Sequence, residues 1–172
     1  HTSGDFSIQE YLRFSKGACE SGILALKAGA PIITDTFMAA SAIIPMAQKT
    51  LQSSVHCVLD WAPLNPANGL TRTALGIESA WDYFQQKSLE DNAPIVVIGS
   101  APIALKVLLD LITKSNFVPS LVVGMPVGFI NVLESKFLLS KKNLHQIRID
   151  GTKGGAALAA ASVNALLRAS IV

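Results

Sequence analysis

Charged residues are scarce in this 172-residue sequence, and aromatic residues are scarcer still. Only 15% of the residues are charged and 6% are aromatic. The net charge is +2, and acidic and basic residues are interspersed rather than gathered in blocks. Nucleic-acid-binding surfaces and partners of anionic membranes are marked by clusters of basic residues, so the composition argues against both. Small-molecule chemistry and protein contact are the function classes that remain.

The sequence has only two cysteines, Cys19 and Cys57, and they do not follow a CxxC spacing. Both lie in apolar surroundings, which favours two reduced thiols and a cytoplasmic protein. No signal-peptide pattern is visible. The most apolar long stretch, residues 93–112, is interrupted by a proline and two charged residues. It therefore fits a strand and an amphipathic helix better than a membrane span.

Half of the residues are hydrophobic, which is enough to bury a large core in one domain. Five short apolar runs predict buried strands over residues 31–34, 55–59, 95–98, 121–123 and 146–149. Helical spacing after each run predicts helices over residues 37–47, 71–87 and 103–113, from residue 129 onward, and over residues 156–168. Two more helices are expected ahead of the first strand, over residues 8–14 and 18–28.

This alternation predicts one α/β domain with a doubly wound, three-layer architecture and a sheet of five parallel strands. Open parallel sheets bind ligands outside the carboxyl ends of their strands. We therefore expect the site at that edge of the sheet. The segments that follow the five strands are Asp35, Asp60 with Trp61, Gly99 with Ser100, the loop 124–128 and the loop 151–155.

The segment after the fourth strand reads GMPVG, residues 124–128. Gly124 and Gly128 permit close approach of the backbone to a ligand, and Pro126 fixes φ and removes one N–H group. The remaining amides can point outward at the start of the following helix. These features are typical of a binding loop, but a loop that only turns the chain has the same pattern. Residue chemistry leaves both interpretations open.

Two other glycine-containing segments lack the signatures of nucleotide binding. The segment that begins at Gly99 has no G-x-G-x-x-G pattern, and Lys153 precedes Gly154 and Gly155 rather than following them as in a P-loop. The paired glycines still open a helix, where free amides and the helix dipole favour carboxylates. Ser100 lies outside a nucleophile elbow, so it is either a helix N-cap or a substrate contact.

The sequence contains three histidines, and they are expected to play different roles. His56 lies inside a strand and is predicted to be a core or sheet-face residue, whereas His145 is predicted at the surface. Neither has a partner at metal-ligand spacing, so no metal site is expected. His1 begins an H-x-x-G pattern ahead of the first helices. On the residues alone, a catalytic histidine and the remnant of a purification tag are equally compatible with it.

Several short motifs follow one another in order from His1 to about Leu167. They are H-x-x-G (1–4), LKAGAPI (26–32) with Asp35, TR (71–72), G-x-A-P-x-A-L (99–105), GMPVGF (124–129), ESK (134–136) and GG (154–155). In this order the motifs resemble those of the precorrin-8X methylmutase family of cobalamin biosynthesis. No single motif is specific, but the ordered set is.

The resemblance implies a flavodoxin-like fold and an isomerase that moves a ring methyl group from C-11 to C-12 of precorrin-8X or its cobalt form, giving hydrogenobyrinate or cobyrinate. It also implies a homodimer that holds this tetrapyrrole near the subunit interface, without a metal or organic cofactor. His1 would be the catalytic acid or hydrogen-bond donor, and Arg72 a substrate contact. Together with the loops at the sheet edge, the expected substrate-binding residues are Asp35, Arg72, Ser100, Gly124, Met125, Pro126, Val127, Gly128, Phe129, Lys136, Gly154 and Gly155.

The sequence departs from the family pattern in two places. It lacks the N-terminal segment that supplies substrate contacts in family members, so we expect residues 1–172 to be a single domain without that segment. Leu70 also replaces the commoner Asn before Thr71 and Arg72. These departures favour a second hypothesis, a non-catalytic module that binds a corrinoid. A third hypothesis, a Rossmann-type nucleotide enzyme, rests on fold analogy alone.

The last predicted helix has an unusual surface. Residues 156–167 read AALAAASVNALL and place alanine around most of the circumference. A helix with a solvated face normally has a polar side. Either this helix lies against a second subunit in a two-fold dimer, or it is enclosed by the sheet and the neighbouring helices of its own chain.

Overall fold

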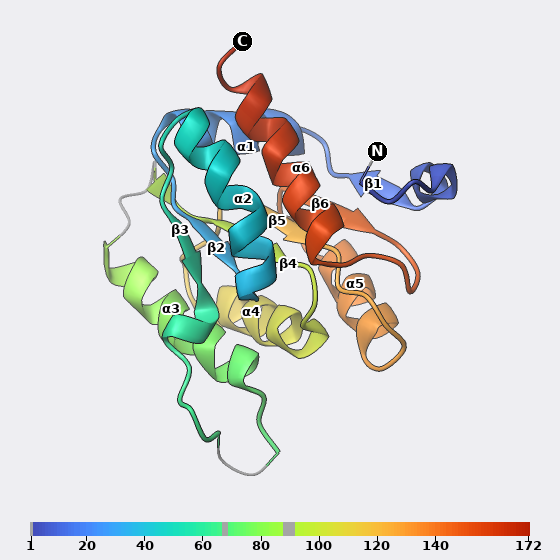
Figure 1. Cartoon of the computed structure of the whole chain (residues 1–172). Helices are drawn as coiled ribbons and strands as arrows, with labels where there is room; N and C mark the ends of the chain where they lie inside the picture. Colours follow the sequence, from blue (N-terminus) through green and yellow to red (C-terminus); the bar gives the residue numbers. More distant parts are fainter. Residues whose placement is uncertain (1, 67–68, 88–91) are drawn as a thin grey trace.

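The centre of the protein is a six-stranded sheet, as seen in a computed structural model that describes residues 2–66, 69–87 and 92–172 (Figure 1). The strand order is β1-β6-β5-β4-β2-β3, and β2 to β6 all run parallel. Among themselves these five strands have the flavodoxin-like order 2-1-3-4-5. The strands are β1 (Leu12–Phe14), β2 (Ile32–Thr34), β3 (Val55–Cys57), β4 (Ile95–Ile98), β5 (Leu121–Gly124) and β6 (Gln146–Ile149).

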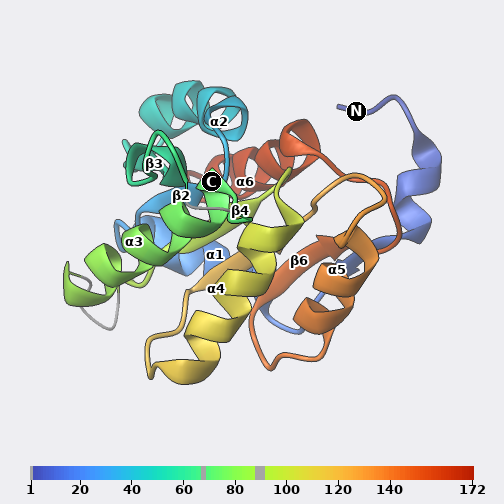
Figure 2. The ribbon, with the colours of Figure 1, turned by 90° about the horizontal axis from the view of Figure 1, so that it is seen from below.

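Helices cover both faces of the sheet (Figure 2). One face carries α1 (Ala18–Lys27), α2 (Phe37–Lys49) and α6 (Ala156–Ala169), and the other carries α3 (Arg72–Lys87), α4 (Pro102–Lys114) and α5 (Val132–Ser140). Successive residues of the central strands serve the two cores in turn, because side chains alternate across a strand. Val97 and Val123 pack beneath α6, whereas Val96 and Val122 pack beneath α4.

The predicted fold class is confirmed, and most predicted elements lie where the periodicity places them. Each of the five apolar runs contains a parallel strand, and each of the five helices expected after a strand is present. The helix predicted over residues 18–28 is also present as α1. Buried apolar runs carry a strong signal because both faces of a central parallel strand must be apolar.

The prediction of five strands was wrong by one, because residues 8–14 do not form a helix. They divide into a 3-10 helix, η1 (Phe6–Glu10), and the short strand β1, which pairs antiparallel with β6. The apolar residues Ile8, Leu12 and Phe14 fit helical spacing about as well as a strand. Pairing with the free edge of β6 decides the conformation, and sequence periodicity does not contain that information.

Two boundaries differ from the predictions for local reasons. Helix α5 begins at Val132 rather than near Phe129, because Asn131 is in the left-handed region with φ 61° and ends the preceding loop. Strand β3 stops at Cys57, and residues 58–60 form a second 3-10 helix, η2 (Val58–Asp60). Asparagine tolerates a left-handed backbone better than most residues, but a regular helical pattern conceals this exception.

The cysteine and histidine predictions agree with the structure. Cys19 and Cys57 are both free thiols. His56 is half-buried and packs against the rings of Trp61 and Phe84, while His145 is exposed. Among the residues that the structure describes, none of the helices combines the length and apolar character needed to cross a membrane.

Candidate active site at the carboxyl edge of the sheet

The loops after β2 and β4 meet through the carboxylate of Asp35. This side chain is completely buried, and its Oδ2 accepts hydrogen bonds from the backbone N–H groups of Ser100 (2.6 Å) and Ala101 (2.7 Å). Helix α4 begins directly afterwards, at Pro102. Asp35, which directly follows β2, therefore supplies the acceptor that a side-chain N-cap normally provides.

The buried Asp35 side chain therefore supports the loop at Ser100 and Ala101, and it has no surface that a ligand could reach. Burial raises the pKa of its carboxyl group, although the amides of Ser100, Gly99 and Ala101 oppose this shift. The alternative of Ser100 as a side-chain N-cap was wrong, since the N-cap of α4 is Ala101, whose methyl side chain accepts no capping bond. Ser100 itself is only partly buried.

The GMPVG and GTKGG loops, which the sequence separates by about two dozen residues, lie against each other. Gly155 N–H donates to the Met125 carbonyl at 2.8 Å, and Gly128 N–H donates to the Thr152 carbonyl at 3.1 Å. Gly154 is required at its position because a Cβ there would lie 2.2 Å from the Met125 oxygen, and its φ is +156°. The two predicted binding loops therefore form one double-layered wall.

The buried ammonium group of Lys136 holds this wall from inside. Lys136 is 2% exposed, and its Nζ donates to the carbonyls of Gly151 (2.7 Å) and Lys153 (2.6 Å). Burial lowers its pKa to about 8, and the charge of Asp150 partly opposes the shift. Lys136 therefore positions the GTKGG loop instead of projecting toward a ligand.

Accessible side chains of the predicted set are found at the outer end of the GMPVG loop. Gly124, Met125 and Pro126 are buried, whereas Val127 is 47% exposed and Phe129 is 88% exposed. An aromatic ring exposed to this degree has little contact with its own chain. Val127 and Phe129 are therefore free to contact a ligand or a second subunit.

Arg72 and Trp61 lie on the α3 side of this edge. Arg72 is the first residue of α3, and its Nε donates to the Pro63 carbonyl at 3.3 Å, within the segment that precedes its own helix. Thr71 caps this helix by accepting from Ala74 N–H. Trp61 packs against His56, Tyr83 and Phe84 in an aromatic cluster. Within the described residues, the hydrogen bond of the Arg72 side chain is to the segment before α3 and not to the GMPVG or GTKGG loop.

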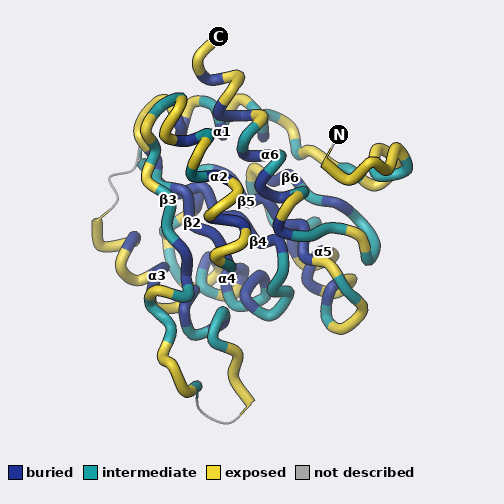
Figure 3. The backbone as a smooth tube through the Cα atoms, in the orientation of Figure 1, coloured by how far each residue is buried: buried dark blue, intermediate teal, exposed yellow. Residues whose placement is uncertain are grey.

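An apolar cavity of about 290 Å³ lies between the N-terminal arm (residues 2–14), β6 and α6. Its lining includes Thr2, Ile8, Phe14, Met125, Ile149 and Ala161. Figure 3 shows that the arm is almost wholly exposed along its length, in contrast to the buried central strands. Met125 thus joins the predicted binding loop to a cavity that sequence reasoning missed. No periodic pattern could have indicated this cavity, because the arm and α6 are at opposite ends of the chain.

His1, the predicted catalytic residue, lies outside the described residues. Its sequence neighbour Thr2 lines the cavity. Within residues 2–66, 69–87 and 92–172, no group of three or more His, Cys, Asp or Glu side chains is arranged to hold a metal ion. The expectation that the protein needs no metal or organic cofactor stays a prediction.

Comparison with known proteins decides the family. The family model described as precorrin-8X methylmutase matches residues 1–169. The chain belongs to the precorrin-8X methylmutase family. Members of this family isomerise precorrin-8X to hydrogenobyrinate by an intramolecular methyl shift in cobalamin biosynthesis.

Individual relatives of this methylmutase family agree with the assignment. The chain is 35% identical to the cobalt-precorrin-8 methylmutase of Synechocystis sp., over 97% of this chain and 80% of that protein. It is 37% identical to the precorrin-8X methylmutase of Pseudomonas aeruginosa, over 96% of this chain and 78% of that one. A solved precorrin-8X methylmutase from Thermus thermophilus superposes with a TM-score of 0.83 at 37% identity, covering 99% of this chain and 81% of that chain.

Proposed function

We propose that this chain catalyses the methyl shift that converts precorrin-8X, or its cobalt form, into hydrogenobyrinate or cobyrinate. The observation that carries the proposal is the match of the methylmutase family model over residues 1–169. Relatives named for both substrate forms match the chain at similar identity, so the proposal covers both forms.

The proposed site is the carboxyl edge of the sheet, with the GMPVG and GTKGG loops as its wall. Val127 and Phe129 would contact the macrocycle, because they are exposed there. Gly128, Ser100 and Gly155 would approach it through partly accessible backbone. Arg72 would bind one of the carboxylate arms of the tetrapyrrole, since guanidinium and carboxylate groups pair well. The buried residues Asp35, Gly124, Met125, Pro126 and Lys136, with the half-buried Gly154, would act by holding these loops in place.

The chemistry requires little of the protein beyond position and one proton. A methyl group can migrate within a conjugated macrocycle once the ring is held in one conformation. A hydrogen bond or proton delivered to the ring favours the product. Histidine suits this role because its ordinary pKa lies near neutrality. We assign the role to His1 on the basis of the H-x-x-G motif of the family.

We further propose a two-fold homodimer whose interface includes the apolar cavity between the N-terminal arm, β6 and α6, which we call the groove beside α6. Phe14 remains 54% exposed at the groove, and Ala161 and Ala165 present small side chains on its other side. Small residues allow a second element to approach closely. Another side of α6 packs against its own chain, since Ala160 is 1% exposed and Asn164 donates to the Ala42 carbonyl on α2. A cytoplasmic location is likewise proposed, on the basis of the two cysteines.

The test is conversion of precorrin-8X by the full chain and by the His1→Ala variant, followed through the absorption spectrum. We expect the wild type to give the hydrogenobyrinate spectrum and His1→Ala to lose at least about 100-fold in kcat, the usual contribution of a general acid. His145→Ala is the matched control, because His145 is an exposed histidine. Undiminished turnover by His1→Ala would remove His1 from catalysis. Wild-type protein that binds the pigment without changing its spectrum would instead be a corrinoid-binding module.

A further inference from the structure

The N-terminal arm is attached to the body of the protein at two places. At its inner end, β1 pairs with β6, and Arg13 forms an ion pair with Asp150 at 3.1 Å. Its outer part consists of residues 2–5 and η1, and η1 contains no fully buried residue. The partial burial of Ile8 against the core is the apolar contribution to the position of η1, and polar contacts add to it.

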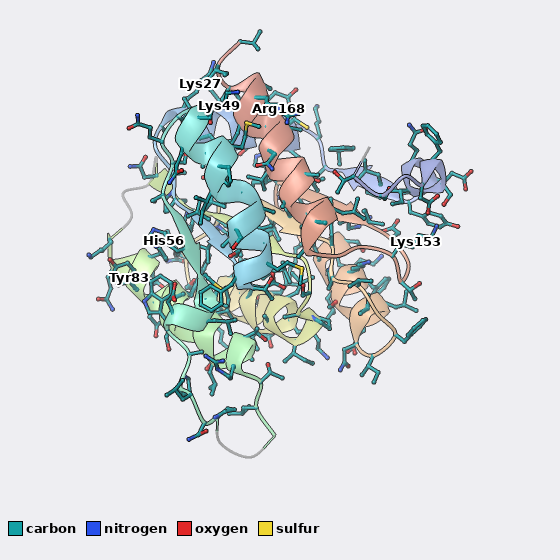
Figure 4. The ribbon with its side chains drawn as sticks, in the orientation of Figure 1. Lys27, Lys49, His56, Tyr83, Lys153 and Arg168 are labelled. Carbon is teal, nitrogen blue, oxygen red and sulfur yellow. The ribbon has the colours of Figure 1, made fainter. Side chains whose placement is uncertain are left out.

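That second attachment is the side chain of Lys153. Its Nζ contacts Asp5 Oδ2 at 2.6 Å and Ser7 Oγ at 2.7 Å. The other carboxylate oxygen of Asp5 accepts from Ser7 N–H at 2.9 Å, which makes Asp5 the N-cap of η1. Figure 4 shows Lys153 on the loop that lies close to the arm. One lysine thus links two residues at the start of the arm to a point 148 positions later in the chain.

The backbone from which the Lys153 side chain extends is held by hydrogen bonds. Its backbone carbonyl accepts the hydrogen bond from the buried ammonium group of Lys136, and Gly155, two residues later, is bonded to Met125. A flexible lysine side chain that starts from a fixed backbone can define the position of its partner. The GTKGG loop therefore bonds to the GMPVG loop on one side and to the N-terminal arm on the other.

We propose that Lys153 is a positioning residue that clamps the arm through Asp5 and thereby fixes the segment from which the proposed catalytic residue His1 extends. His1 lies four positions before Asp5 in the sequence, a separation that a fully extended chain spans in roughly 14 Å. The inference rests on the proposed function for its catalytic consequence. Its structural part, the clamp itself, does not depend on that function.

Kinetics distinguish this role from direct binding of a substrate carboxylate by Lys153. The clamp predicts that Lys153→Met and Asp5→Asn each lower kcat about tenfold and leave KM within about twofold, because misplacing a catalytic group affects the chemical step. The double variant should lose no more than either single variant, since both remove the same interaction. Lys153→Arg should restore most of kcat. Lys142→Met, which removes a lysine whose Nζ donates to the Thr113 hydroxyl, is the matched control and should leave kcat unchanged.

Hydrogen exchange of the amides of residues 6–11 supplies a readout that does not require turnover. We expect faster exchange in Lys153→Met and Asp5→Asn and wild-type exchange in Lys142→Met. Unchanged exchange in the first two variants would refute the clamp whatever the activity. A raised KM confined to Lys153→Met would also refute it in favour of a substrate contact. A wild type that converts no precorrin-8X would refute the proposed function. Hydrogen exchange of the arm amides would then still test the clamp by itself.

Discussion

Lys136 occupies surroundings that are costly for a charged group. Its ammonium group is removed from water and bonded to two backbone carbonyls, with Asp150 as the neighbouring negative charge. Carbonyl oxygens can accept hydrogen bonds from an amine as well as from an ammonium group. The site therefore satisfies the donors of Lys136 without stabilising its charge as strongly as water does, and burial lowers the pKa to about 8.

This lowered pKa makes stability depend on pH in a defined direction. Between about pH 8 and the ordinary lysine pKa of 10.5, the unfolded chain binds more protons at this position than the folded chain does. The free energy of unfolding should therefore rise with pH over this window. We expect the difference between wild type and Lys136→Met, measured by urea unfolding, to grow in favour of the wild type from pH 8 to 10.5. Parallel curves would show that the folded-state pKa of Lys136 is not lowered.

At the scale of elements, Asp35 is the contact that fixes the end of β2 against the start of α4. The strands themselves are joined by regular pairing, but their loops leave the sheet and require bonds of their own. Gly99 allows the close approach of α6 at the same point, because a Cβ there would lie 2.6 Å from the Ala156 Cα. Three segments distant in sequence thus meet around one carboxylate and one glycine.

Removing the Asp35 carboxylate should be costly, and retaining an acceptor should recover much of the loss. Asp35→Ala leaves two buried amides without partners, so we expect a loss of about 2–4 kcal/mol in the free energy of unfolding. Asp35→Asn keeps an oxygen that can accept both bonds and should lose less than half as much. Asp82→Ala, an exposed aspartate on α3, should change stability by less than about 0.5 kcal/mol. Equal losses in the Ala and Asn variants would show that the charge matters rather than the hydrogen bonds.

At the scale of the whole molecule, the alanines of α6 fall into two groups, one in the core and one at the groove. Ala160 packs into the core beneath the helix, whereas Ala161 lines the groove. A glutamate at Ala160 is expected to unfold the protein and says nothing about assembly. Only a substitution on the groove side can distinguish an interface from internal packing.

We expect wild-type protein at micromolar concentration to have twice the 18.2 kDa mass of the chain by light scattering. Ala161→Glu should give the single-chain mass with an unchanged circular dichroism spectrum, because it introduces a charge into an apolar interface. Ser79→Glu, on the exposed side of α3 across the sheet, should remain dimeric. A wild-type monomer would contradict the dimer, and a dimeric Ala161→Glu would place its interface elsewhere.

The local sequence determined the architecture and the position of the two glycine-containing loops at the carboxyl edge of the sheet. Continuous apolar runs such as residues 95–98 and 121–123 can only be strands buried on both faces, and the helical spacing after each run requires a parallel, doubly wound sheet. The glycines at 124, 128, 154 and 155 marked the two loops at its carboxyl edge. These features depend on neighbours within about ten residues, which is the range over which periodicity and turn chemistry act.

The tertiary structure alone decided how these parts are connected. Whether residues 12–14 form a strand depends on the free edge of β6, and the roles of Asp35, Lys136 and Lys153 depend on partners 65, 15 and 148 positions away. In sequence, Asp35 and Lys136 resembled substrate contacts. Burial converted them into supports, because a polar side chain removed from water has to bond to the groups that surround it. Folding fixes which groups those are.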